Sequence, residues 1–159
     1  MKKIILSLLI FSSAAFSLSI SPEIGASGGN ININGNSYSS FGANARIWLG
    51  FSNFVIAPQY KYQSISGEFY DFSRQQYGLS VGYKFDLSLL SLTPYVGANY
   101  STFSRTFENS FAYNGGLRLK LGFLPLFASV EYEYQSLKSK YTGYKTNMDG
   151  VSFNIGLSF

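Results

Sequence analysis

The chain of 159 residues is rich in aromatic side chains and poor in charged ones, with 18% Phe, Trp and Tyr against 13% Asp, Glu, Lys and Arg. So few charges do not suit an ordinary soluble surface, and a formal net charge of +4 is too weak to indicate nucleic-acid binding. The absence of His and Cys excludes Ser-His dyads, cysteine nucleophiles, imidazole metal sites and disulfides. We therefore expect no metal site and no cofactor.

The first 17 residues have the pattern of a secretory signal peptide. Two lysines precede a short apolar run, residues 4–11, and small residues follow it. The run is shorter than the roughly 17–25 residues of a transmembrane helix, which argues against the alternative of a membrane anchor. An Ala-Phe-Ser triplet ending at Ser17 fits the small-x-small cleavage pattern, so we expect cleavage after Ser17 and one domain over residues 18–159.

The rest of the chain alternates between apolar and polar residues in eight segments, as strands with two different faces do. The apolar-face positions recur at every second residue within 20–26, 41–49, 54–62, 77–85, 92–100, 111–121, 126–134 and 151–159, and none of them is charged. Charges in these segments or at their ends all fall on the other face: Glu23, Arg46, Lys61, Lys84, Asp86, Arg118, Lys120, Glu131 and Glu133. The pattern indicates that the two faces meet different environments.

The direction of the apolar face distinguishes two classes of barrel. A soluble barrel turns that face inward to a ligand, whereas an outer-membrane barrel turns it to lipid. Segments of roughly nine to eleven residues can cross a bilayer when tilted, which favours the membrane class. Aromatic residues also gather at the segment ends, as they do at lipid headgroups. They are Phe41, Tyr60, Tyr62, Tyr77, Tyr100, Phe111, Tyr113, Tyr132 and Tyr134 toward one rim, and Phe54, Phe85, Phe123 and Phe159 toward the other.

The links between the segments alternate short and long, as periplasmic turns and external loops do. Short links fall near 50–53, 87–91 and 122–125, and longer ones near 27–40, 63–76, 101–110 and 135–149. The sequence thus predicts an all-β fold, an eight-stranded antiparallel up-and-down transmembrane β-barrel. Its last strand should pair with its first, because every backbone group in lipid needs a partner.

The polar face is expected to fill the lumen with a paired charge network of Glu23, Arg46, Lys61, Lys84, Arg118, Lys120, Glu131 and Glu133. Glu131 and Glu133, roughly 7 Å apart along one strand, are also compatible with acid–base chemistry in a glycosidase. Cations on the preceding strand favour pairing over catalysis. A four-residue turn is expected to put Arg118 opposite Glu131, and a two-residue turn to put Lys120 opposite Glu131 and Arg118 opposite Glu133.

Two predicted loops and one proline carry further expectations. Residues 136–147 hold basic and aromatic side chains that could bind lipopolysaccharide or a host polyanion, or form a solvated tip. The candidates are Lys138, Lys140, Tyr141, Tyr144 and Lys145. Residues 66–75 are expected to form a loop that packs against its neighbours or binds a ligand. Pro58 lies near the middle of a segment, where a missing N–H predicts a β-bulge.

Several stretches, "LTPYVGANYSTF", "FAYNGGLRLKLGF", "SVEYEYQS" and "VSFNIGLSF", give the chain a family resemblance. It resembles the opacity-protein and outer-membrane-protein-A-like β-barrel family of Gram-negative envelopes, over most of the mature chain. The resemblance implies a surface structural protein, adhesin or antigen. The final Phe159 also resembles the signal that the barrel assembly machinery reads.

The predicted function is therefore that of a non-enzymatic outer-membrane surface protein, structural or adhesive through its external loops. A narrow porin-like channel and an envelope hydrolase using lumen carboxylates are the alternatives. The expected partners are outer-membrane lipid, lipopolysaccharide, the barrel assembly machinery and a host or environmental surface ligand, with no nucleic acid among them.

Overall fold

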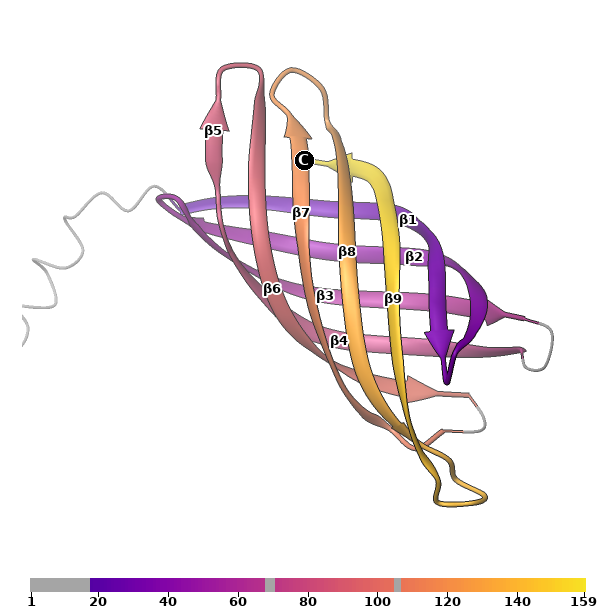
Figure 1. Cartoon of the computed structure of the whole chain (residues 1–159). Coiled ribbons are helices and arrows are strands. Elements are labelled where there is room, and N and C mark those ends of the chain that lie inside the picture. The colour runs from indigo at the N-terminus through magenta and orange to yellow at the C-terminus, as the bar shows by residue number, and fades with distance from the viewer. Residues whose placement is uncertain (1–17, 68–70, 105–106) are drawn as a thin grey trace, which may run out of the picture.

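A closed antiparallel β-barrel makes up the computed structural model, which describes residues 18–67, 71–104 and 107–159 (Figure 1). The predicted signal peptide lies outside the described residues. The strands are β1 (Leu18–Ile33), β2 (Asn36–Phe51), β3 (Phe54–Ser66), β4 (Asp71–Tyr83), β5 (Phe85–Leu87), β6 (Leu90–Phe103), β7 (Ser110–Leu121), β8 (Leu126–Lys138) and β9 (Lys145–Ser158). Among the described residues, no helix is long and apolar enough to span a membrane.

Closure of the ring follows from two pairings. β1 pairs with β9, so the last strand meets the first. β4 and β5 are two parts of one barrel strand interrupted at Lys84, and both pair with β6. The described chain therefore forms eight barrel strands in meander order, which confirms the predicted fold. We call the end with the links β2–β3, β5–β6 and β7–β8 the turn end, and the opposite end the loop end.

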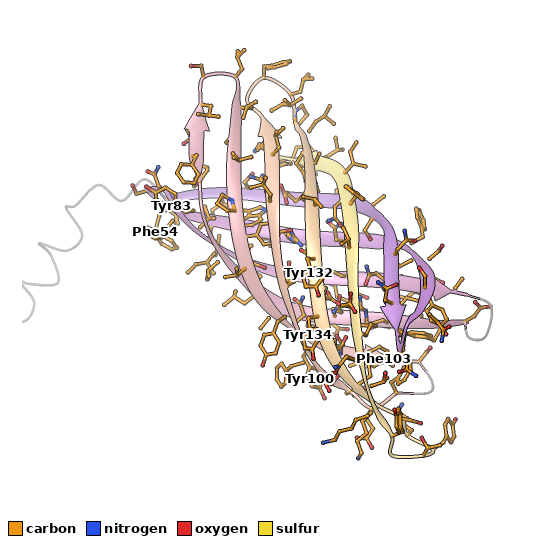
Figure 2. The ribbon with its side chains drawn as sticks, viewed as in Figure 1. Phe54, Tyr83, Tyr100, Phe103, Tyr132 and Tyr134 are labelled. Atoms are coloured by element: carbon orange, nitrogen blue, oxygen red, sulfur yellow. The ribbon has the colours of Figure 1, made fainter. Side chains whose placement is uncertain are left out.

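Apolar side chains at alternate positions form the outer surface of the barrel, as the sequence predicts. Phe41 and Ile155, for example, remain 71% and 66% exposed. Aromatic residues lie toward both ends of this apolar belt (Figure 2), with Tyr100 and Tyr134 toward the loop end and Phe54 toward the turn end. The intervening side chains point inward and are mostly buried.

The strands continue much farther toward the loop end than expected. Residues 27–40, predicted as a long link, belong to β1 and β2 apart from a two-residue turn. Asn34 and Gly35 form that turn with φ of 52° and 84°, the positive values of a type I′ hairpin. The prediction of a long loop here is therefore wrong. The Asn-Gly pair, which is a strong hairpin signal, indicates the observed turn.

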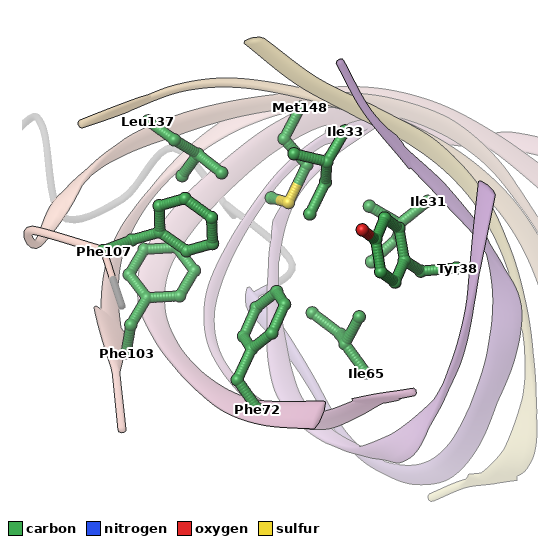
Figure 3. Close-up of a cluster of buried hydrophobic side chains, with 9 residues drawn as sticks. All are labelled: Ile31, Ile33, Tyr38, Ile65, Phe72, Phe103, Phe107, Leu137 and Met148. Atoms are coloured by element: carbon green, nitrogen blue, oxygen red, sulfur yellow. The ribbon is translucent and has the colours of Figure 1, made fainter. Parts of the chain in front are cut away.

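At the loop end the inward face becomes apolar. Nine buried side chains form what we call the apolar plug, which fills the barrel interior there (Figure 3). Its members are Ile31, Ile33, Tyr38, Ile65, Phe72, Phe103, Phe107, Leu137 and Met148. Rings of Phe72, Phe103 and Phe107 contact one another with centroids 5.6 to 6.1 Å apart. The predicted 66–75 loop is thus partly strand, since β4 begins at Asp71; residues 68–70 lie outside the described part.

Pro58 introduces no bulge, which corrects the prediction. The register of β2 against β3 is the same on both sides of the proline, from Arg46↔Gln59 to Leu49↔Ile56. Only the two intervening pairs, Ile47 with Pro58 and Trp48 with Ala57, are missing from the ladder. Both pairs require a hydrogen bond from an N–H at residue 58 to the carbonyl of Ile47, and proline has no N–H. The strand therefore loses one bond without gaining an extra residue, and the β3–β4 ladder through Pro58↔Leu79 is continuous.

Candidate functional site: the barrel interior and the β8–β9 hairpin

The centre of the barrel interior is organised around Glu131 of β8. Its carboxylate forms ion pairs with Arg46 from β2 and Lys61 from β3, and accepts a hydrogen bond of 2.8 Å from the hydroxyl of Tyr95 on β6. Both carboxylate oxygens are therefore occupied, in a side chain only 2% exposed. The Arg46 guanidinium also lies 4.8 Å from the centre of the Tyr95 ring, which supports its charge further.

Glu133 forms a second centre two residues nearer to the loop end. It pairs with Arg74 of β4, and its other oxygen accepts from Gln76 at 3.1 Å and lies 3.8 Å from Lys61. Arg74 in turn donates to Gln63 and, at 3.1 Å, to Gln135. Lys61 thus joins the two glutamates into one buried group.

Glu23 of β1 forms the third centre, nearer to the turn end. Its two oxygens accept from Arg118 of β7 at 2.5 Å and from the indole N–H of Trp48 at 2.7 Å. Arg118 also donates to Ser158 at 3.1 Å and lies 5.1 Å from the Trp48 ring centre. We call the three centres together the central network. It joins strands from every side of the barrel.

Two predicted lumen cations lie outside the central network. Lys84, in the break between β4 and β5, pairs with Asp86 at 3.0 Å near the turn end. Lys120 donates to the hydroxyl of Ser21 at 2.9 Å. The structure therefore joins six of the eight predicted residues, Glu23, Arg46, Lys61, Arg118, Glu131 and Glu133, to buried partners and leaves Lys84 and Lys120 at the mouth.

The predicted partners of Glu131 and Glu133 are wrong. Neither Arg118 nor Lys120 faces Glu131, because the four-residue link 122–125 sets a register of Gly116↔Glu131 and Arg118↔Ser129. The ion pairs join residues across the barrel interior and not residues on adjacent strands. Long side chains from distant strands meet in the narrow lumen, whereas ladder neighbours on one face point in parallel.

Sequence reasoning missed Arg74, Gln63, Gln76, Gln135 and Tyr95. The first four were assigned to loops or to positions beyond the segments, because the predicted strands ended too early. A simple signal was present: Arg74 and Gln76 continue the inward parity of Ser80 on the same strand. Extending each alternation until a turn residue appears would have found them.

The β8–β9 hairpin carries the predicted loop residues. Lys138 ends β8 and pairs at 3.0 Å with Glu108, so it is not a free cation. Tyr141 and Tyr144 are 83% and 65% exposed on the six-residue link, and Lys140 and Lys145 are exposed beside them. The tip is ordered by main-chain bonds from Ser139 to Tyr144 (2.9 Å) and from Gly143 to Ser139 (3.1 Å). The hairpin therefore presents two tyrosines and two cations to the surroundings.

Comparison with solved structures identifies the class of fold. The chain is similar to Neisserial surface protein A, with a TM-score of 0.63 and 15% identity over 89% of this chain and 99% of that one. It is also similar to Ail, the attachment invasion locus protein of Yersinia pestis, with a TM-score of 0.53 and 18% identity over 88% of this chain and 97% of Ail. Ail in complex with the heparin analogue sucrose octasulfate matches with the same score and 20% identity, over 89% of this chain and 99% of that one. No protein-family model and no curated protein matches the sequence.

Proposed function

We propose that this protein is a non-enzymatic outer-membrane protein, structural or adhesive, which its barrel anchors in the lipid and whose loop end carries its interactions. The apolar belt is the observation that carries this proposal. A soluble protein would not leave so many large apolar side chains exposed around its whole circumference, whereas lipid solvates them. The fold shared with Neisserial surface protein A and Ail supports the same class.

The proposed route to the membrane is export by the signal peptide of residues 1–17, followed by insertion by the barrel assembly machinery. Phe159 is the proposed recognition residue of that machinery. Its side chain is 65% exposed beside the belt, and its N–H donates to Pro22 of β1 at 2.9 Å. In this orientation the turn end faces the periplasm and the loop end faces outward.

Cysteine labelling tests both the location and the orientation. The chain has no Cys, so single Lys140→Cys and Ser88→Cys variants each carry one thiol, at the loop end and the turn end. On intact cells an impermeant maleimide should label only the first variant. The folded membrane protein should also migrate differently in a gel before and after boiling. Labelling of Ser88→Cys alone would reverse the topology, and a soluble unboiled protein would refute the membrane location.

The β8–β9 hairpin is the proposed binding element, and a sulfated or phosphorylated polysaccharide is its proposed ligand. Lys140 and Lys145 provide charge without a carboxylate partner among the residues that the structure describes, and Tyr141 and Tyr144 provide exposed rings for sugar stacking. The heparin analogue bound to Ail is a ligand of this chemistry. Lipopolysaccharide and host glycans both meet this description.

Heparin chromatography of the refolded protein tests the hairpin. A Lys140→Gln/Lys145→Gln double variant should elute at lower salt than the wild type. Each lost lysine contact lowers the number of counterions that heparin releases on binding, so the binding is weaker. Ser88→Glu/Leu89→Glu makes a matched control, since it lowers the net charge by the same two units on the exposed β5–β6 link at the opposite end of the barrel. Equal elution of the wild type and the double variant would exclude the hairpin as the binding element.

The channel and the hydrolase are less well supported. A channel requires an open lumen, whereas Arg46, Lys61 and Glu131 cross the centre in nearly complete burial. A hydrolase requires an available acid, and the oxygens of Glu131 and Glu133 are already paired. We expect no steady single-channel conductance in planar bilayers and no glycosidase or esterase activity. Stable ion-selective steps that change in Glu131→Gln would favour the channel.

A further inference from the structure

A half-open cavity of about 330 Å³ lies within the barrel mouth at the turn end, where Arg118 and Trp48 of the central network form part of its inner wall. Among the described residues, three cations line it, Lys84, Arg118 and Lys120, against a single side-chain carboxylate, Asp86, and Phe159 at the chain end also borders it. Trp48 lines it as well. The cavity is therefore a partly enclosed space with an excess of positive charge, at the opposite end of the molecule from the proposed binding hairpin.

Lys120 differs from the other lumen-facing cations of the described chain, because it has no carboxylate within 4.0 Å. The others each have at least one: Arg46, Lys61, Arg74, Lys84 and Arg118. Within the described part of the chain, the Lys120 ammonium donates only to Ser21, whose hydroxyl lies 3.0 Å from that of Ser158 and donates to the main-chain oxygen of Phe159 at 2.7 Å. A serine hydroxyl orients the ammonium but does not neutralise it.

The side-chain carboxylate of the cavity neutralises little of this charge. Asp86 pairs with Lys84 at 3.0 Å, and the two side chains are 63% and 30% exposed. Exposed ion pairs of this kind are weak, so an anion in the cavity competes with Asp86 at small cost. Arg118 is held by Glu23 and adds a fixed charge to the inner wall. Lys120 and Lys84 are thus the two cations that can turn toward a ligand.

We propose that this cavity binds a phosphate group, with Lys120 as its main cationic contact and Lys84 as the second. Lysine binds phosphate as a point charge, and Ser91, opposite Lys120 in the β6–β7 ladder, brings a hydroxyl donor. The volume is at the lower end of the range for small-ligand sites, which suits a phosphate monoester or a lipid headgroup. Apolar Leu87 and Leu121 also line the cavity and adjoin the belt, so a headgroup can enter from the membrane side.

Trp48 is the only tryptophan of the chain, and it provides a reporter inside the proposed site. The refolded barrel in zwitterionic detergent is titrated with inorganic phosphate at constant ionic strength, with chloride as the reference anion. Broadening of the phosphorus NMR signal reports binding independently of Trp48. A second arm adds phosphatidylglycerol to the micelles in place of free phosphate. We expect saturable changes with phosphate in at least one arm, and none with chloride.

Lys120→Gln should weaken the response about tenfold, as expected for the loss of one charge-assisted contact. Lys140→Gln, which removes a cation at the loop end, should leave it unchanged. Lys84→Gln should weaken the response less than Lys120→Gln, and it serves as the second variant if Lys120→Gln does not refold to the heat-modifiable form.

The two arms separate the sources of phosphate. A response to inorganic phosphate assigns the site to a free anion or monoester, and a response to phosphatidylglycerol alone assigns it to a lipid headgroup. No saturable response in either arm, or an equal response in wild type and both lysine variants, would overturn the proposal. Each of these results is independent of the heparin experiment on the opposite hairpin.

Discussion

The belt and the loop-end region of this barrel bury opposite kinds of side chain, although the same strands run through both. Within the belt, Ile24 and Ile155 point outward and the central network lies inside. Toward the loop end, Asn32 and Ser64 point outward and the apolar plug lies inside. The strand parity is unchanged between the two regions; only the identity of the residues on each face is reversed.

The reversal is the pattern expected if the two regions face different solvents. Apolar burial drives folding in water, so the loop-end region packs like a soluble barrel. Lipid gives no such drive for interior packing, and the belt region is held by its ladder and by buried ion pairs. The point of reversal therefore marks where the strands leave the proposed bilayer on the outer side.

The largest expected effect is the loss of Glu131 in the belt region. Glu131→Gln leaves Arg46 and Lys61 buried without their shared carboxylate, which should lower the free energy of unfolding by roughly 3–5 kcal/mol. Urea unfolding of the barrel refolded in vesicles, followed by Trp48 fluorescence, measures the loss. Asp86→Asn, which breaks an exposed pair, should cost at most about 1 kcal/mol. Equal losses in the two variants would contradict a stabilising interior network.

The apolar plug should be sensitive to cavities in the way of a soluble core. Phe72→Ala removes a ring that contacts both Phe103 and Phe107 and should cost roughly 3 kcal/mol. Its effect should be local, with faster amide exchange in the loop-end halves of β3 and β4. Phe153→Ala, on the outer surface of the belt, should cost less because it leaves no enclosed cavity. The reverse order would mean that the plug is not a packed core.

A new charge on the outer surface should affect stability differently in the belt and in the loop-end region. Val81→Arg places a cation on the belt between the aromatic ends of β4 and should cost roughly 2–4 kcal/mol if that surface meets lipid. Ser64→Arg, also outward but in the loop-end region, should change the unfolding free energy by at most about 0.5 kcal/mol. Refolding yield and urea midpoint in vesicles measure both. Tolerance of both arginines would show that no lipid surrounds the belt.

Sequence patterns were sufficient for the belt because its alternation is simple. Every second residue of the belt is apolar, as contact with lipid would require, so the period-2 pattern, the strand number and the direction of each face follow from the sequence. Partner choice within the network does not follow. It depends on strand register and on which long side chains meet across the lumen, as when Glu131 pairs with residues of β2 and β3.

The loop-end region was mispredicted for a different reason. A pattern with apolar residues inside and polar residues outside was treated as loop, because the expected face had changed. Ile31 and Ile33, followed by Asn-Gly, have the same alternation as the belt with the hydrophobic face reversed. An alternation should therefore be followed through a change of solvent, which would have placed Arg74 and Phe72 on β4.

The smallest expected effect belongs to the exposed ion pair of Lys138 and Glu108 at the loop end. Both side chains are nearly half exposed, at 46% and 45%, so water screens their attraction. A double-mutant cycle with Lys138→Gln and Glu108→Gln should give a coupling of about 0.2–1 kcal/mol, which decreases as salt is added.

The matching cycle on Arg74 and Glu133 sharpens the comparison. That pair is buried beneath the apolar plug, so its coupling should be larger and nearly independent of salt, because ions do not reach it. A strong salt dependence at Arg74 and Glu133 would mean that water and ions enter the interior from the loop end. The apolar plug would then fail to seal the lumen, and the case against a conducting channel would lose its structural basis.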